Sequence, residues 1–316
     1  MGAYIGRRVL MAIPTLIAVS ILTFFLMSIV PGDPAAVILG QGATAELLET
    51  VREQLGLNDP PHVRYVKWVK NLVTLGDLGE SQVLAGQSIS KLIKERFPVT
   101  LNLIVYTMVF SLAVGIPLGT ISAVRHDTWM DYLFRVISVI GLSVPVFWLG
   151  LMTILFLVRV FTWTPELQWI NPFHDPWGNL KQVVWPVVTL GYFQVAFISR
   201  MTRSALLEVL SEDYMRTARA KGLRERVITV RHGLRNAMIP VLTVGGLQLV
   251  SLLGGMVITE KVFNLAGWGT LLIDGVLYND FPVVQSMLFM MAAVVIAINL
   301  VMDVLYAWLD PRIRYG

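Results

Sequence analysis

The most informative stretch of this sequence is residues 211–240, SEDYMRTARAKGLRERVITVRHGLRNAMIP. They lie between two long apolar runs, yet they are densely charged, and Gly222 divides them in the middle. Ser211 can cap a helix N-terminus, because two acidic residues follow it in the favourable first turn. Glu212 and Arg216 are spaced to pair at i,i+4. Since glycine commonly ends a helix, we predict a first short helix that stops at Gly222.

A second amphipathic helix is predicted after the glycine. Its apolar residues recur at helical spacing, at Leu223, Val227, Val230 and Leu234. Two short helices joined at a glycine would form a compact knob on the membrane surface. The alternative interpretation is a basic loop that lies among the lipid headgroups.

The composition indicates an all-α, polytopic membrane protein. Of 316 residues, 55% are hydrophobic and 15% are charged, whereas an ordinary soluble domain has about 25% charged residues. The mean hydropathy is +0.67. There is no cysteine, which excludes disulfides and thiolate metal sites. The net charge of +4 does not point to nucleic acid, because basic residues in a membrane protein set its orientation.

Six uncharged stretches are long enough to cross a bilayer as helices. They are Val9–Val30, Phe97–Val124, Val136–Val158, Gln182–Ser199, Asn236–Thr259 and Phe281–Met302. We expect the first to be an uncleaved helix, because no small-residue cleavage site follows it. The domains expected are therefore an N-terminal transmembrane helix (1–30), an extracytoplasmic segment (31–97) and a five-helix core (98–316). Within 31–97, Glu46–Leu57 and His62–Leu75 are predicted to be short amphipathic helices.

The charges predict the orientation. With the N-terminus in the cytoplasm, the loops 1–8, 125–135, 200–235 and 303–316 sum to 2 + 0 + 5 + 0 = +7. The loops on the other side sum to −3, since 31–97, 159–181 and 260–282 give −1, 0 and −2. Because positively charged loops stay inside, six spans with both termini cytoplasmic fit this asymmetry.

The segment 211–240 resembles the cytoplasmic coupling signature of ABC-importer permeases, whose core is Glu-Ala-Ala, three further residues and Gly. Ala218 and Gly222 keep that pattern, whereas Arg216 and Thr217 depart from it. The run DYMRTARAKGL at 213–223 is similar to the variant found in dipeptide and oligopeptide importer permeases. The residues RH, LRNA and IP within 231–240 extend the similarity.

Four further stretches resemble the same family. They are Val30–Pro34, Gly76–Ser81, Ser143–Trp148 and the loop 260–282 before the last span. The resemblance implies a six-helix permease subunit of the prokaryotic inner membrane, which forms half of a translocation pathway with a homologous permease. Two ATP-binding subunits would hold ATP and Mg²⁺ at the cytoplasmic side, and an extracytoplasmic binding protein would deliver the substrate. Di- or oligopeptides are expected as substrate, with oligosaccharides or nickel chelates as alternatives.

The resemblance also implies roles for particular residues. The side chains expected to couple this chain to the ATP-binding subunits are Tyr214, Met215, Ala218, Arg219 and Gly222. In the external loop 260–282, the candidates for contact with the binding protein are Glu260, Phe263, Gly267 and Gly269. Ala266 stands where the family usually has proline. In related importers such a loop reaches toward the docked binding protein, and the alternative is a structural re-entrant turn.

Four polar residues within the spans are candidates for the pathway. Gln194 and Gln248 lie mid-span, where they could line a polar path or form hydrogen bonds between helices. Asn299 and Asp303 share one face of the last helix, and an ionisable residue in such a position indicates function by default. Asp303 could instead pair with Arg200 or Arg203.

Motifs for catalysis are absent from the sequence. There is no G-x-x-x-x-G-K-[ST] phosphate loop, no H-E-x-x-H spacing and no G-x-S-x-G elbow. We therefore expect a non-catalytic transport subunit with no metal or cofactor of its own. A secondary transporter is the alternative from another class, and it would show an internal repeat and broken helices.

Overall fold

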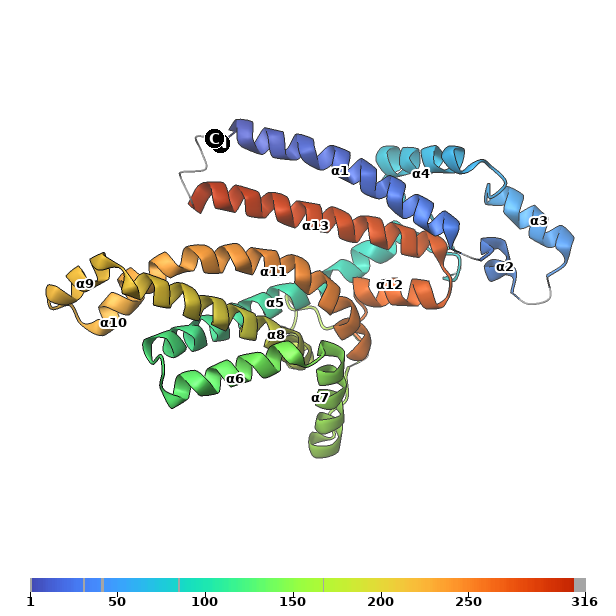
Figure 1. Cartoon of the computed structure of the whole chain (residues 1–316). Coiled ribbons are helices and arrows are strands. Elements are labelled where there is room, and N and C mark those ends of the chain that lie inside the picture. Colours follow the sequence, from blue (N-terminus) through green and yellow to red (C-terminus); the bar gives the residue numbers. More distant parts are fainter. Residues whose placement is uncertain (1, 31, 41–42, 85, 167, 310–316) are drawn as a thin grey trace. The chain divides into compact units, whose positions relative to one another are not determined.

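The computed structural model shown in Figure 1 describes residues 2–30, 32–40, 43–84, 86–166 and 168–309. Within these residues the secondary structure is helical, apart from one isolated β-bridge between Glu80 and Ser88. The chain divides into two compact units. Unit 1 contains residues up to 100 together with 266–301, and unit 2 contains 101–265 and the residues from 302 onward.

Five of the described helices are long and apolar enough to cross a bilayer. They are α1 (Gly2–Ile29), α5 (Ile89–Val124), α8 (Pro176–Ser211), α11 (Arg235–Val262) and α13 (Phe281–Leu309). A sixth span is present if α6 (Trp129–Ser143) and α7 (Val146–Phe161) count as one bent crossing. The prediction of an all-α membrane protein is thereby confirmed.

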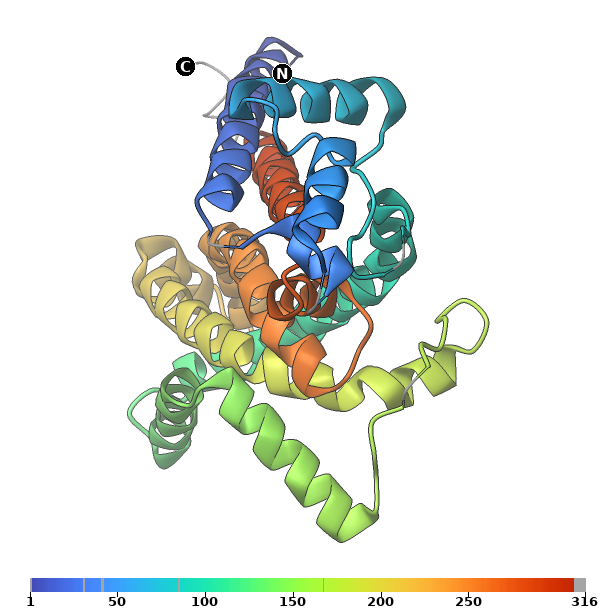
Figure 2. The ribbon, with the colours of Figure 1, turned by 90° about the vertical axis from the view of Figure 1, so that its right-hand side faces the viewer.

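The stretch Val136–Val158, predicted to be one span, is divided between two helices. The chain bends by 102° between α6 and α7, and Figure 2 shows the two helices running in different directions. Pro145 lacks an N–H and disfavours the helical conformation of the residue before it. Val144 accordingly has φ −87° and ψ 126°, which is extended backbone. The break therefore arises at Val144–Pro145.

Unit 1 has three short helices between its first two spans. The two predicted amphipathic helices are confirmed as α3 (Ala45–Gln54) and α4 (Pro61–Leu75), while α2 (Pro34–Leu39) was not predicted. Asp33 caps α2, because its Oδ1 accepts the Ala35 N–H at 3.1 Å. The Arg52 guanidinium, which lies 2.6 Å from Asp33 Oδ2, lowers the pKa of that carboxyl. The turn at the end of α1 is thus tied to α3.

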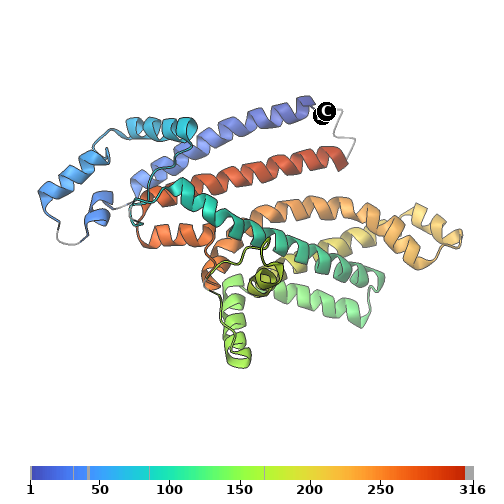
Figure 3. The ribbon, with the colours of Figure 1, turned by 180° about the vertical axis from the view of Figure 1, so that it is seen from behind.

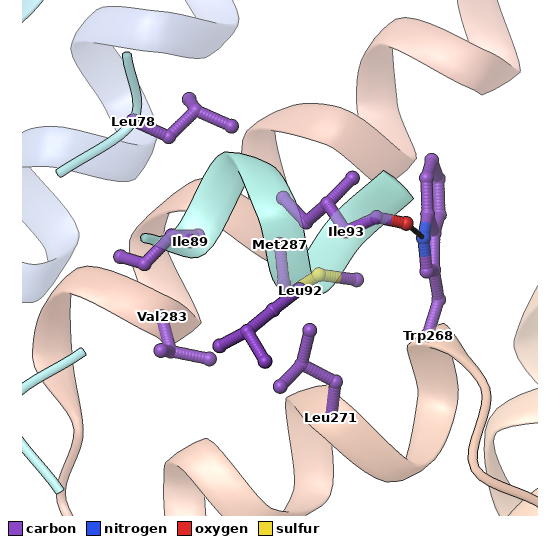
Figure 4. Packing of buried hydrophobic residues seen from close by; sticks show 8 residues of the cluster. All are labelled: Leu78, Ile89, Leu92, Ile93, Trp268, Leu271, Val283 and Met287. Atoms are coloured by element: carbon purple, nitrogen blue, oxygen red, sulfur yellow. Dashed lines mark hydrogen bonds between the residues drawn. The ribbon is translucent and has the colours of Figure 1, made fainter. Parts of the chain in front are cut away.

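The core of unit 1 forms where α12 (Trp268–Leu277) meets the start of α5, as Figure 4 shows. The Trp268 indole donates from Nε1 to the Ile93 carbonyl at 2.8 Å, and the Trp268 backbone N–H donates to Thr100 Oγ1 at 2.8 Å. Leu271 and Met287 complete the contact with buried apolar side chains. Because both hydrogen bonds and apolar contacts fix α12 against the start of α5, α12 is a structural part of this unit.

Asp280 fixes the loop that precedes α5. Its carboxylate accepts hydrogen bonds from the Ser81 hydroxyl, from the Gln82 N–H at 3.3 Å and from the Val83 N–H at 3.2 Å. The Asp280 side chain is buried, so these bonds compensate for its lost hydration. The loop that contains the predicted turn Gly76–Ser81 is therefore a fixed part of unit 1.

Unit 2 is built around α8, which is buried along much of its length and packs against α6, α7 and α11. Its apolar core includes Ile198, Leu206 and Val241. Gly119 on α5 allows a close approach to α8, because a Cβ at that position would clash with the Ser199 carbonyl. The residues 211–235 follow directly from the end of α8, so a well-packed helix supports them.

Candidate coupling site

The coupling segment, which we define as residues 211–235, begins where α8 ends at Ser211. Figure 3 shows its helices beyond the ends of α8 and α11. The first predicted helix is confirmed as α9 (Asp213–Ala220). The predicted cap is wrong: Ser211 is the last residue of α8, and its hydroxyl donates to the Glu208 carbonyl at 2.7 Å. Glu212 occupies the N-cap position without a side-chain cap bond, and Arg216 pairs with Asp213 instead of Glu212.

Gly222 ends the first helix, as predicted. Its φ is +75°, a left-handed conformation that glycine adopts without a steric penalty. Its N–H donates to the Arg219 carbonyl at 2.9 Å, and the Leu223 N–H donates to the Ala218 carbonyl at 3.4 Å. These bonds satisfy carbonyls that the helix end would leave unpaired. A Cβ added at Gly222 would meet no described heavy atom within 4 Å, so the position is open to a neighbouring molecule.

The second helix differs from its prediction in register. It begins as α10 (Glu225–Val227), continues as a π-helix, η1 (Ile228–Leu234), and joins α11 at Arg235 without a break. A π-helix closes its hydrogen bonds at i→i+5, which rotates the side chains relative to an α-helix. Ile228 and Gly233 are buried. Of the predicted apolar face, Leu223, Val227 and Val230 are exposed, and Leu234 is half-buried.

Buried contacts hold α9 against η1. The Met215 side chain is fully buried, and its Cε would lie 3.4 Å from a Cβ placed on Gly233. Tyr214 Oη accepts a hydrogen bond from Asn236 Nδ2 at 2.9 Å, which joins α9 to the first turn of α11. Met215 therefore fixes α9 by packing, while Tyr214 fixes it by a hydrogen bond and leaves its ring exposed.

The remaining surface of the segment is exposed, partly apolar and basic. Exposed fractions of 38–52% are found for its large apolar side chains, which are Tyr214, Leu223, Val227 and Val230. Seven basic residues and three acidic residues give 7 − 3 = +4 for residues 211–235. Arg219 pairs with Glu225 at 3.1 Å, but both side chains are exposed, so this pair contributes little to stability. Exposed apolar side chains among charged ones are typical of a surface that binds another protein.

The sequence did not predict the polar anchor below this segment. Asp131 is fully buried and accepts two hydrogen bonds from Arg203, at 2.7 and 2.8 Å, and one from Ser122 at 2.6 Å. The Asp127 N–H also donates to it, at 3.1 Å. The cluster ties the turn between α5 and α6 to α8, eight residues before the end of α8. The available signal was an acidic residue within an apolar run, which is rarely placed there without a partner.

The four polar candidates within the spans have different environments. Gln194 and Gln248 are buried on the adjacent helices α8 and α11. Gln194 Oε1 has no hydrogen-bond partner among the described residues. Asn299 is exposed and Asp303 is half-buried. Arg203, one of the two arginines considered as a partner for Asp303, bonds to Asp131 at 2.7 Å.

The four candidates in the external loop 260–282 are buried. Glu260 and Phe263 have exposed fractions of 0% and 1%, and Gly267 and Gly269 are also buried. Phe263 lies close to Gly150 of α7, because a Cβ on that glycine would be 3.4 Å from its ring. This burial favours the structural re-entrant turn over direct exposure of these four residues to a partner.

Comparison with known families identifies the chain. The family described as "Binding-protein-dependent transport system inner membrane component" matches residues 115–315, and its N-terminal companion family matches residues 1–104. The chain belongs to this family. It is accordingly a multi-pass inner-membrane component of a binding-protein-dependent transport system, and the resemblance seen in the sequence is confirmed.

Three relatives of this permease match it over 99–100% of their length. The dipeptide transport system permease protein DppB of Alkalihalophilus pseudofirmus is 38% identical over 335 residues, which covers 100% of both chains. The oligopeptide transport system permease protein AppB of Bacillus subtilis is 40% identical, also over 100% of both chains. The glutathione transport system permease protein GsiC of Shigella flexneri is 44% identical over 99% of both chains.

Proposed function

We propose that this permease forms half of the translocation pathway of an ATP-driven importer for short peptides. Its full-length relatives bear the names of dipeptide, oligopeptide and glutathione permeases, and all three of those substrates are peptides. A homologous permease would supply the other half of the pathway. Two ATP-binding subunits would carry ATP and Mg²⁺, and an extracytoplasmic binding protein would deliver the peptide.

The observation that carries the proposal is the exposed apolar and basic face of the coupling segment. Leu223, Val227 and Val230 face outward although α10 and η1 have a buried side available to apolar residues. Exposed apolar side chains rimmed by charge mark a protein interaction site. We assign this face to an ATP-binding subunit. Its closure on ATP would shift the helix bundle only if the segment makes different contacts in the two states.

The roles of the candidate residues divide by burial. Tyr214, Ala218, Arg219 and Gly222 would contact or shape the interface, while Met215 would hold α9 in place. Gln194 is the strongest candidate for the pathway, because its buried amide oxygen has no hydrogen-bond partner among the described residues and calls for water or substrate to satisfy it. The buried residues of the external loop would give it its shape rather than touch the binding protein.

Both termini and the coupling segment are proposed to be cytoplasmic, on the evidence of the +7 against −3 charge asymmetry. The chain contains no cysteine, so single cysteines can be introduced without a background. A membrane-impermeant thiol reagent should label Leu47→Cys in intact cells and should leave Lys221→Cys unlabelled until the cells are opened. The reverse pattern would contradict the proposed topology.

The proposed substrate is tested by transport. The chain is reconstituted in vesicles with its partner permease, the ATP-binding subunits and the binding protein, and uptake of labelled di- and tripeptides is followed with and without ATP. Uptake should require ATP and the binding protein, and the isolated chain should hydrolyse no ATP. Peptide uptake that persists without ATP, or transport of a non-peptide solute in preference to peptides, would overturn the proposal.

A further inference from the structure

Helix α4 packs against the membrane-spanning part of unit 1. The Tyr65 hydroxyl lies 2.8 Å from Ser20 Oγ on α1, and the Tyr65 and Phe24 rings are 5.4 Å apart in an edge-on arrangement. Trp68 lies 5.6 Å from the ring of Phe289 on α13, again edge-on. Figure 1 shows α4 beside α1. One face of α4 is therefore fixed by two different spans.

These contacts set the depth of α4 relative to the spans. α1 is apolar from Gly6 to Ile29 and leaves most of that surface exposed, as a lipid-facing helix does. With a rise of 1.5 Å per residue, Phe24 lies roughly 7 Å and Ser20 roughly 13 Å from the end of α1 at Ile29. Phe289 lies about 12 Å from the start of α13 at Phe281. Helix α4 thus lies at a level that both spans place within the bilayer.

The side chains on the exposed sides of α4 suit a position at the membrane surface. Val66 and Val73 are seven residues apart, on one side of the helix, and their exposed fractions are 62% and 76%. Lys67 and Lys70 lie on the neighbouring side and are also exposed. Together with Arg64 they give α4 three basic residues and no acidic one. The preceding helix α3 differs sharply, because it has three acidic residues and one basic residue.

We propose that α4 is an interfacial helix that binds anionic phospholipid. Its packed face rests on α1 and α13, Val66 and Val73 insert among acyl chains, and Lys67 and Lys70 reach the headgroup phosphates. Lys67 keeps a 2.6 Å ion pair with Asp59, while Arg64 and Lys70 form no ion pair in the described part of the chain. A basic amphipathic helix of this kind lies in the membrane surface and prefers anionic lipid. The segment 31–97 would then be only partly in water.

The test uses nitroxide labels on the complete permease with its partner subunits in lipid nanodiscs. Labels at Val66→Cys and Val73→Cys are compared with a matched label at Leu47→Cys, an exposed apolar position on α3. Collisions with oxygen, which concentrates in the bilayer, should dominate at 66 and 73, and collisions with a water-soluble nickel chelate should dominate at 47. Nickel accessibility at 66 and 73 equal to that at 47 would overturn the proposal. Protection from both reagents would also overturn it, because a protein partner would then cover α4.

A second experiment tests the preference for anionic lipid. Phosphatidylcholine discs with phosphatidylglycerol should bring the label at 73 deeper than discs without it. Lys67→Gln with Lys70→Gln should abolish that difference, whereas Lys91→Gln, an exposed lysine outside α4, should preserve it. Equal depth of the native α4 in both lipids would refute recognition of the anionic headgroup.

Discussion

The coupling segment 211–235 and the external loop 260–282 have the same plan and opposite burial. Each joins two spans and contains a short helix, α9 in the first and α12 in the second. In α9 only Met215 is buried, whereas α12 buries five of its ten residues. Two connections between spans can therefore have different structural roles. The buried helix α12 completes the core of its own unit, whereas most of the surface of α9 stays exposed.

The two connections should therefore fail differently when they are changed. A substitution in α12 removes contacts that the fold itself needs, because Trp268 donates two hydrogen bonds and packs 5.0 Å from Phe97. A substitution on the exposed side of the coupling segment removes little from the isolated chain. Its effect should appear only when the ATP-binding subunits are present.

The largest loss of stability is expected for Trp268→Ala. Truncating a buried tryptophan costs about 3–5 kcal/mol through lost burial and the cavity that remains. The amount of intact protein in membranes and the thermal unfolding midpoint of the purified chain should both fall. Tyr278→Ala, at a position in the same loop with 61% exposure, is the matched control and should behave like the native chain. A stable Trp268→Ala protein would show that α12 is not a core element.

The polar anchor below the coupling segment should come next. Asp131→Ala leaves Arg203 without its partner, and breaking a buried pair costs about 3–5 kcal/mol. The thermal midpoint of the purified chain measures this loss. The double variant Asp131→Leu with Arg203→Leu should recover part of it, because Arg203 is then no longer a buried charge without its partner. Arg135, which lies 3.3 Å from Asp131, loses its ion pair in both variants, so this loss is the same in the comparison. If the double variant is no more stable than the single one, the pair does not act as a coupled anchor.

A smaller, local effect is expected for Met215→Ala, about 2 kcal/mol for the loss of a buried side chain at the edge of the unit. Hydrogen exchange of the backbone amides in 213–235 should accelerate, while the amides of α8 keep their protection. Met215→Leu conserves volume and should leave exchange nearly unchanged. Faster exchange throughout α8 would mean that the segment and its supporting helix unfold as one unit.

The smallest effect on stability is expected for Arg219→Ala. An exposed ion pair contributes about 0.2–1 kcal/mol, so the thermal midpoint of the isolated chain should hardly change. ATP hydrolysis of the assembled transporter should nevertheless become less dependent on the binding protein. Lys221→Ala should change this dependence less than Arg219→Ala does. A large destabilisation of the isolated chain would show that this face already has partners within the chain.

The sequence predicted those features that depend on local chemistry. Gly222 is predicted to be a helix end, and α3, α4 and the five single-helix spans are predicted near their observed positions, because glycine geometry and apolar runs act over a few residues. The break at Val144–Pro145 was missed, since prolines inside spans are often tolerated and only tertiary packing decides whether the helix bends. The Asp131–Arg203 pair lies 72 residues apart, and no spacing in the sequence indicates it. Burial of Glu260 and Phe263 likewise depends on neighbours distant in the chain.

The central claim is that the exposed face around Gly222 binds the ATP-binding subunits. The decisive measurement is co-purification of those subunits with Gly222→Asp, compared with native chain and with Gly222→Asn, which has a similar shape and no charge. A side chain at Gly222 would strain the left-handed backbone by about 1–2 kcal/mol. It would meet no described atom within 4 Å, so no clash adds to this cost and the spans should remain folded. We expect normal membrane content, loss of the ATP-binding subunits and loss of transport for Gly222→Asp, with a weaker effect for Gly222→Asn. Co-purification and transport at native levels for Gly222→Asp would contradict it.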